Sequence, residues 1–148
     1  MLFLSRNIFF YKDLNFKDSF ETRIYLMFFH YSIILIISKQ KKYKIDQTNY
    51  NNFFLNIENN LRELGLGDVS VNKKMKDLNK LFYDILLKLN LDESYFRINV
   101  NLVGKYFDIL NQNTEKMEKC EKYFVKLYEF CFDKTPENMI QDLKKFKF

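Results

Sequence analysis

The sequence predicts an all-α fold: a single-domain bundle of about five to six helices that contains a glycine-hinged αα-hairpin. Three observations support this. Three glycines and one proline in 148 residues are too few for the closely spaced turns of a β-sandwich or barrel. Apolar residues recur at helical spacing in several long segments. Hydrophobic residues make up 47% of the chain, enough for one core, so residues 1–148 are expected to form one domain.

The first fifteen residues are expected to form an arm that packs on this domain. Residues 1–12 read MLFLSRNIFFYK and carry two cations, Arg6 and Lys12, without an acidic residue. The same composition fits a rudimentary targeting segment or a helix that touches a membrane. The segment lacks the long apolar run and small-residue cleavage site of a secretory signal.

The most hydrophobic segment, 20–38, is predicted to be the central buried helix, because a helix that is apolar on all sides is normally enclosed by others. Its uninterrupted apolar part, Ile24 to Ile37, is shorter than the roughly 20 residues that cross a bilayer. Peripheral membrane insertion is the alternative. The segment ends in a cluster of lysines, which suits a helix C-terminus: Lys39, Lys41, Lys42 and Lys44.

Two helices joined by a glycine turn are predicted over 49–65 and 70–90. Gly65 stands where a left-handed residue ends a helix, and Asp68 or Ser70 is expected to cap the second helix. In the second helix, apolar and charged residues gather on opposite faces, so the pair forms an αα-hairpin. The first helix has one apolar stripe with a period of 3.6 residues: Tyr50, Phe53, Phe54, Ile57, Leu61 and Leu64.

Three more helices are predicted over 94–111, over 114–133 and from Pro136 to about Lys145. Gly104 weakens the first prediction. Thr114 is expected to cap the second helix, where apolar residues repeat every three or four positions. In the third, Thr135 is the N-cap and Pro136 the first helical residue.

The two cysteines, Cys120 and Cys131, are expected to be buried thiols in a reducing compartment. On one helix they would lie about 16 Å apart, beyond the roughly 7 Å limit for a disulfide. With one histidine and no CxxC motif, neither a metal site nor a cofactor is expected. The sequence also lacks a phosphate-binding glycine loop and a nucleophile motif, so we do not expect an enzyme.

His30 is the residue of the apolar helix that invites a functional interpretation. It follows Arg23 by two turns on the same face, and these two residues are a candidate functional core. His30 is either a heme ligand, partner contact or proton carrier, or a neutral imidazole hydrogen-bonded inside the core. Heme or quinone binding would need a second ligand or polar anchor, which the sequence does not reveal.

The formal net charge of +5 favours anionic partners such as ribosomal RNA or an anionic membrane surface, although it also fits a basic proteome. The chain has no long run of like charges, so DNA binding is not expected. A basic helical module that binds membrane or RNA, without a dedicated client, is therefore one functional hypothesis.

A second hypothesis comes from the segment LRELGLGDVSVNKKMKDLNKLFY, residues 61–83. It resembles the signature of the ubiquinol–cytochrome c chaperone family, in which LRE precedes a G-x-G-D-x-S-V turn, a basic helix and an aromatic pair. The matching residues are Leu61, Arg62, Glu63, Gly65, Gly67, Asp68, Ser70, Val71, Lys73, Lys74, Lys76, Phe82 and Tyr83.

Weaker matches flank this signature. Phe20, Arg23 and His30 fit the first helix of the family. Arg97 and Asn99 fall near an expected Arg–Asn pair, here separated by one residue. Asp84 departs from the small residue usual after the aromatic pair.

The resemblance implies a helical, non-enzymatic factor that assists the biogenesis of respiratory complex III. The implied client is newly made cytochrome b. The ribosome, the membrane surface and a small partner subunit are further expected partners. We expect a bacterial cytoplasmic protein peripheral to the inner membrane, or the mitochondrial matrix and inner membrane in a eukaryote.

Within the signature, Gly65, Gly67 and Ser70 are expected to shape the turn, which an Arg62–Asp68 or Glu63–Lys73 ion pair would bridge. Client capture would require an exposed aromatic patch near the hairpin. The residues expected to contact partners are Arg62, Glu63, Asp68, Lys73, Lys74, Lys76, Lys80 and Tyr83.

Overall fold

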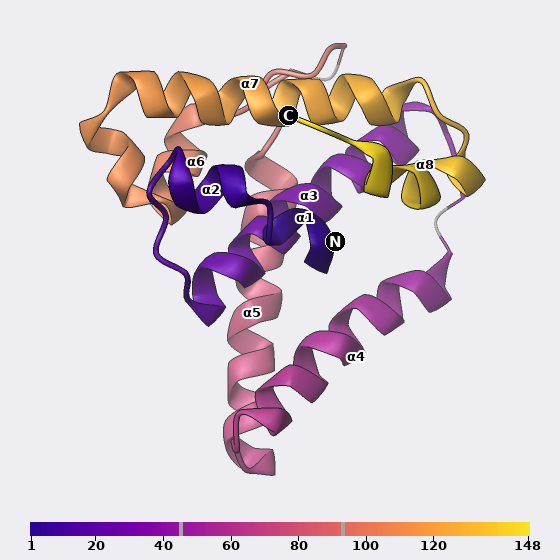
Figure 1. Ribbon diagram of the computed structural model, residues 1–148. Helices are drawn as coiled ribbons and strands as arrows, with labels where there is room; N and C mark the ends of the chain where they lie inside the picture. Colours follow the sequence, from indigo (N-terminus) through magenta and orange to yellow (C-terminus); the bar gives the residue numbers. More distant parts are fainter. Residues whose placement is uncertain (45, 93) are drawn as a thin grey trace.

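The computed structural model describes residues 1–44, 46–92 and 94–148, and it confirms the predicted all-α fold (Figure 1). Buried side chains from the first helix to the last form one hydrophobic core. The helices are α1 (Leu2–Ser5), α2 (Ile8–Lys12), α3 (Phe20–Gln40), α4 (Gln47–Glu63), α5 (Asp68–Lys88), α6 (Val100–Tyr106), η1 (Asp108–Gln112), α7 (Thr114–Phe132), α8 (Pro136–Asp142) and η2 (Leu143–Lys145), where η marks a 3-10 helix.

Helix α3 lies at the centre of the fold, as predicted, and contacts α1, α5 and α7. The Ser19 side chain begins it by accepting a hydrogen bond from the Thr22 amide at 3.2 Å. With 21 residues, α3 is longer than the apolar run noted in the sequence, and its length and composition would allow it to cross a membrane. In this fold 67% of that stretch is buried, so α3 is the core helix of the bundle.

The core is built largely from aromatic rings. Phe28 of α3 meets Phe82 of α5 edge to face, with ring centroids 5.3 Å apart. Phe29 of α3 stacks on Phe124 of α7 at 5.5 Å. These edge-to-face and offset geometries suit the ring quadrupoles, so the contacts stabilise the packing of α5 and α7 on α3.

Helices α4 and α5 form the predicted αα-hairpin, and they diverge from the turn that joins them (Figure 1). The turn lies at the end of the molecule away from α7. The chain termini lie on one face of the bundle, where α1, α2 and the last residues line a common groove.

The helix predicted over 94–111 is wrong in its first part. Asn90 and Ile98 form an isolated antiparallel bridge, and the Asn99 amide donates to the Leu89 carbonyl at 2.8 Å. These backbone hydrogen bonds hold the segment before Asn99 beside the end of α5, so α6 begins only at Val100.

The second part of that prediction is interrupted at Phe107, where α6 gives way to η1. Gly104 is buried, and a Cβ atom there would lie 2.1 Å from Oδ1 of Asn111. The Asn111 side chain donates to the Gly104 carbonyl at 3.1 Å. The glycine therefore leaves room for the chain to fold back onto α6.

The ends of the last long helices differ slightly from prediction. Asn113, rather than Thr114, is the N-cap of α7, and its side chain accepts a hydrogen bond from the Lys116 amide at 3.0 Å. Thr135 and Pro136 begin α8 as predicted, although the Thr135 side chain makes no cap hydrogen bond.

Candidate functional site

The turn of the hairpin is closed by backbone hydrogen bonds around Gly65. The Gly65 amide donates to the Arg62 carbonyl at 2.9 Å, and the Leu66 amide donates to the Leu61 carbonyl at 3.4 Å. Gly65 has a φ of 85°, in the left-handed region, and Leu66 packs against the core. This is a Schellman motif, so Gly65 ends α4 as predicted.

Capping of α5 by Asp68 or Ser70 is a wrong prediction. Gly67 is the N-cap, with extended backbone, and no side chain caps the helix. The Asp68 carboxylate instead accepts a hydrogen bond from the Arg62 guanidinium, which also pairs with Glu58 at 2.8 Å. Of the two predicted bridges, the described residues contain Arg62–Asp68 but not Glu63–Lys73.

Lys73, Lys76 and Lys80 lie on one exposed face of α5, and we call them the lysine ridge. Among the residues that the structure describes, no carboxylate forms an ion pair with these three side chains. Asp77 lies between them in sequence and is also exposed. Lys74 is half-buried and lies 3.8 Å from Glu21, so it faces the beginning of α3 rather than the ridge.

An aromatic groove of about 600 Å³ runs between α4 and α5. The hydroxyls of Tyr50 and Tyr83 lie 3.1 Å apart and join the two helices. Tyr83 is 50% exposed and Leu55 is 52% exposed. Phe54 packs on Phe82 at 5.2 Å, so the aromatic core continues to the surface here. The groove is lined by Tyr50, Asn51, Asn52, Phe54, Leu55, Glu58, Asn79 and Tyr83.

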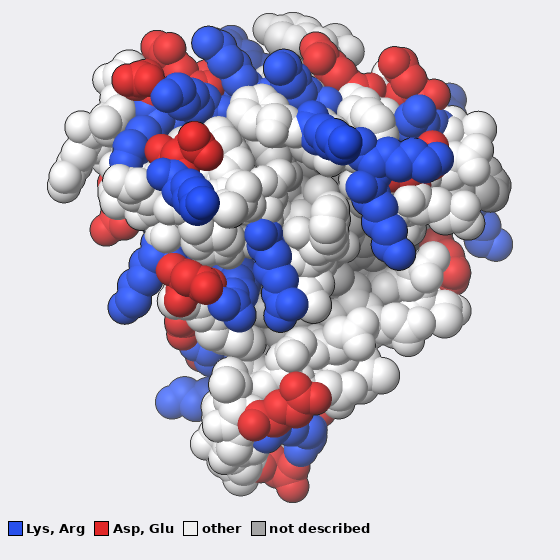
Figure 2. All heavy atoms as spheres, viewed as in Figure 1, with Lys and Arg blue, Asp and Glu red and all other residues white. Residues whose placement is uncertain are grey.

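Of the described residues that line this groove, Glu58 alone is charged. Figure 2 shows a largely uncharged surface over the visible side of α4, whereas Lys, Arg, Asp and Glu crowd the upper part of the molecule. The polar groups that line the groove are mainly side-chain amides and tyrosine hydroxyls. Its chemistry therefore suits an apolar chain segment that also presents hydrogen-bonding groups.

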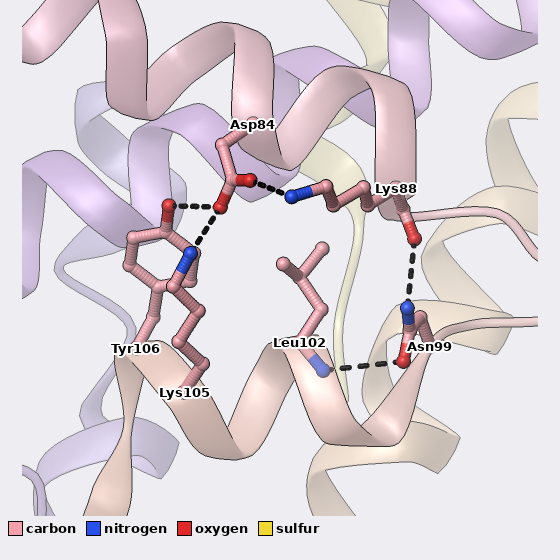
Figure 3. Close-up of polar contacts among 6 residues, drawn as sticks. All are labelled: Asp84, Lys88, Asn99, Leu102, Lys105 and Tyr106. Carbon is pink, nitrogen blue, oxygen red and sulfur yellow. Dashed lines mark hydrogen bonds and ion pairs between the residues drawn. The ribbon is translucent and has the colours of Figure 1, made fainter.

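Asp84 fastens α5 to α6 (Figure 3). Its carboxylate accepts hydrogen bonds from Lys105 at 2.6 Å, from Tyr106 at 2.7 Å and from Lys88. These contacts, with that of Lys105 the largest, hold the pKa of Asp84 well below its ordinary value. Asp84, which stands where a small residue is usual after the aromatic pair, is thus held by hydrogen bonds from three side chains.

Asn99 strengthens the same junction. Its side-chain nitrogen donates to the Lys88 carbonyl at 3.1 Å, and its side-chain oxygen accepts from the Leu102 amide at 3.2 Å (Figure 3). The side-chain amide of Asn99 therefore provides a donor for a carbonyl at the end of α5 and caps the beginning of α6. The Arg97 side chain is exposed, and its backbone amide donates to Asn90.

His30 is fully buried in α3. Its Nδ1 lies against the Leu26 carbonyl, and its Nε2 lies 2.9 Å from the Tyr123 hydroxyl. Burial lowers the pKa of His30 to about 3, so the imidazole is neutral. With both ring nitrogens engaged by protein groups, His30 has the geometry of a hydrogen-bonded core histidine.

Arg23 is not brought into contact with His30. Its guanidinium lies near the surface and pairs at 2.6 Å with the carboxylate of Asp18, a residue that precedes α3. The two residues of the candidate functional core therefore belong to separate surroundings, one half-exposed and one buried.

Cys120 and Cys131 are unbridged and buried, as predicted. Burial raises the pKa of both thiols, that of Cys131 to about 12, so neither is an activated nucleophile. Within residues 1–44, 46–92 and 94–148, no group of three or more His, Cys, Asp or Glu side chains is arranged to hold a metal ion.

The structure thus brings Arg62 and Asp68 together at the turn and places the lysine ridge and Tyr83 on the body of α5. Glu63 and Ser70 are exposed beside the turn. Tyr50 and Leu55, which line the groove with Tyr83, were not among the residues that the sequence predicted for the site. Tyr50 carried only the signal of a helical stripe, and Leu55 lies outside that stripe.

The sequence was also compared with models of known protein families, with curated proteins and with solved structures. The sequence model of the ubiquinol–cytochrome C chaperone family matches residues 12–95, more than half of the chain. This range includes α3, the whole hairpin and its glycine turn. No curated protein and no solved structure matches the chain significantly. On the family match, the chain belongs to the ubiquinol–cytochrome c chaperone family.

Proposed function

We propose that this chain is an assembly chaperone that binds newly made cytochrome b in its aromatic groove and keeps it competent for assembly. Family membership supplies the general role in the assembly of ubiquinol–cytochrome c reductase, a complex of mitochondrial or bacterial membranes, and implies a non-enzymatic protein. Cytochrome b as the client, and the groove as its binding site, belong to the proposal.

The observation that carries the groove assignment is the exposure of large apolar side chains beside an aromatic core. Tyr83 and Leu55 are half exposed next to Phe54, whereas the outer surface of a helical bundle is ordinarily polar. Apolar side chains left in water favour burial by a partner, at about 25 cal/mol for each Å² covered. A newly made membrane protein presents apolar helical segments that fit such a groove.

The lysine ridge supports a second contact, with the ribosome. Three exposed ammonium groups on one face of α5 attract phosphate groups, while neighbouring Asp77 reduces their net charge. In this proposal the ridge holds the chaperone near the site of client synthesis, at the cytoplasmic face of a bacterial inner membrane or its mitochondrial equivalent. A small partner subunit would bind elsewhere on the bundle.

The test is affinity capture of newly made cytochrome b from a translating extract. The double variant Leu55→Ser, Tyr83→Ser removes the exposed apolar parts of the groove together with the Tyr50–Tyr83 contact. It replaces no buried side chain, so it is expected to fold and to capture at least tenfold less client. The matched control, Ile109→Ser with Ile140→Ser, changes exposed apolar side chains of η1 and α8 and is expected to capture normally.

Two results would count against the proposal. Equal capture by the groove variant and the wild type would remove the groove from the binding site. Capture that is unaffected by the groove substitutions and disappears at high salt would favour the alternative of a basic module that binds RNA or membrane without a dedicated client.

A further inference from the structure

A second exposed apolar surface lies where the two ends of the chain meet. Four large side chains there are exposed, and we call them the terminal patch: Leu2 (44%), Phe3 (62%), Ile8 (60%) and Phe148 (42%). They line an open groove of about 650 Å³ together with Arg6, Asn7, Phe146 and Lys147. The patch shares no residue with the aromatic groove of the hairpin.

Helices α1 and α2 are apolar on both sides. Leu4, Phe9 and Phe10 point into the core and account for the packing of these helices on the bundle. Folding does not require the outward positions of the same helices to be apolar, yet Leu2, Phe3 and Ile8 stand there. An outer surface of this kind suits burial in something other than the protein itself.

The charged side chains that line the groove of the terminal patch are cationic. Arg6 and Lys147 line the groove, and Lys126 lies over the Phe148 ring, 5.0 Å from its centroid. Among the described residues that line the groove, none is acidic. Figure 2 shows an uncharged region near the termini of Figure 1, bordered by Lys and Arg side chains among which some Asp and Glu side chains also lie.

We propose that the terminal patch docks the protein on a bilayer that contains anionic phospholipid. Leu2, Phe3 and Ile8 enter the boundary between headgroups and acyl chains, while Arg6 and Lys147 meet the headgroup phosphates. Anionic lipid is the partner that matches both features, since RNA offers no acyl phase and a neutral bilayer offers no use for the cations. The aromatic groove stays free for a client during this docking.

The first test is sedimentation of the purified chain with vesicles of equal parts phosphatidylglycerol and phosphatidylcholine. The variant Phe3→Ser, Ile8→Ser is expected to partition at least tenfold more weakly. In the variant Arg6→Gln, Lys147→Gln, the partition coefficient is expected to fall about fivefold for each cation removed. This factor corresponds to about 1 kcal/mol per basic residue at an anionic surface.

Matched controls change the same chemistry elsewhere. Val69→Ser with Leu87→Ser alters two exposed apolar side chains of α5, and Lys42→Gln with Lys44→Gln alters two exposed lysines. Both controls are expected to sediment like the wild type. Thermal unfolding of each variant, followed by circular dichroism, verifies that it is folded.

A second measurement uses the absence of tryptophan from the chain. Phe3→Trp places the chain's single tryptophan in the terminal patch. With excitation selective for tryptophan over tyrosine, its emission is expected to shift to shorter wavelength when anionic vesicles are added. Leu87→Trp is the matched reporter on α5 and is expected not to shift.

Failure of the wild type to sediment, wild-type partitioning by the patch variants, or an unshifted Phe3→Trp emission would each overturn the proposal. Equal binding to phosphatidylcholine alone would overturn the assignment to anionic lipid. These assays contain no client, so their failure would leave the capture of cytochrome b by the hairpin untouched.

Discussion

The hydroxyl of Tyr123 in α7 lies 2.9 Å from Nε2 of His30 in α3, and the two residues are 93 positions apart in the sequence. The Leu26 carbonyl at Nδ1 can only accept, so Nδ1 carries the proton and Nε2 accepts from Tyr123. This pairing fixes one neutral tautomer and joins the two helices through a polar contact inside an aromatic core.

The first prediction concerns pH. The pKa of His30 falls from 6.5 to about 3 on burial, so below pH 6.5 the unfolded chain binds a proton that the folded chain does not. The stability associated with neutral His30 is complete above pH 6.5 and declines by about 1.4 kcal/mol per pH unit as pH falls towards 3. Urea unfolding of the wild type and His30→Gln at about pH 7.5 and about pH 5 measures this, and the wild type should lose about 2 kcal/mol more than the variant.

Parallel pH profiles for these two proteins would contradict the prediction. Tyr123→Phe provides a second readout, because it removes only the hydroxyl and leaves Nε2 buried without a donor. We expect it to lower the free energy of unfolding by about 1–3 kcal/mol at neutral pH.

The second prediction concerns the hairpin turn. Gly65 has a φ of 85°, a conformation that costs an L-residue roughly 1–2 kcal/mol, so Gly65→Ala should lower the free energy of unfolding by about that amount. Gly67→Ala is the control, because Gly67 has a negative φ and open space where a Cβ would lie. Its effect should stay within about 0.5 kcal/mol, and equal effects of both substitutions in chemical denaturation would refute the role of the left-handed turn.

The third prediction concerns Asp84, whose carboxylate joins α5 to α6. Asp84→Asn weakens its contacts with Lys105, Lys88 and Tyr106 and should destabilise the fold by about 1–2 kcal/mol at neutral pH. Because the pKa of Asp84 is lowered in the folded chain, its contribution is complete above about pH 4 and is lost as pH falls further.

The measurement is denaturant unfolding of Asp84→Asn and wild type at neutral and acidic pH. The difference between them should narrow below about pH 4. Asp77→Asn, on the same helix but exposed, should remain close to the wild type throughout. A pH-independent cost of Asp84→Asn would show that packing, not charge, explains it.

The fourth prediction concerns the lysine ridge. Reversing Lys73, Lys76 and Lys80 to Glu should leave helicity and melting unchanged, since these side chains are exposed. Ribosome association should weaken, and the dependence of log K on log salt should become shallower by about 0.7 for each phosphate that the ridge no longer neutralises. Reversal of Lys42, Lys44 and Lys122, which lie elsewhere on the surface, tests whether net charge alone is responsible. Ribosome binding that survives ridge reversal at physiological salt would identify the ridge as solvated surface.

The long helices were predictable because each has a continuous apolar stripe or, in α3, an apolar surface on all sides. The turn was predictable because Gly65 meets a specific backbone requirement. The segment before α6 was not, because its bridge from Ile98 to Asn90 is a backbone interaction that hydrophobic periodicity does not reveal. The cap of α5 was misassigned because Gly67 adopts the extended N-cap conformation and frees Asp68 to pair with Arg62.

Contacts between distant segments could not be predicted from the sequence for a different reason. Nothing local to His30 points to Tyr123, and nothing near Asp84 points to Lys105 and Tyr106. The aromatic groove likewise depends on how α4 and α5 pack, which decides that Tyr50 and Tyr83 meet at the surface while Phe82 is buried.

The most direct test of the central claim is deletion of the gene in a cell that makes ubiquinol–cytochrome c reductase, followed by quantification of cytochrome b and of each respiratory complex. We predict that cytochrome b and complex III fall together while the other complexes stay at normal levels. The wild-type gene should restore both, and the Leu55→Ser, Tyr83→Ser variant should not. Normal complex III and cytochrome b in the deletion strain would contradict the proposed function.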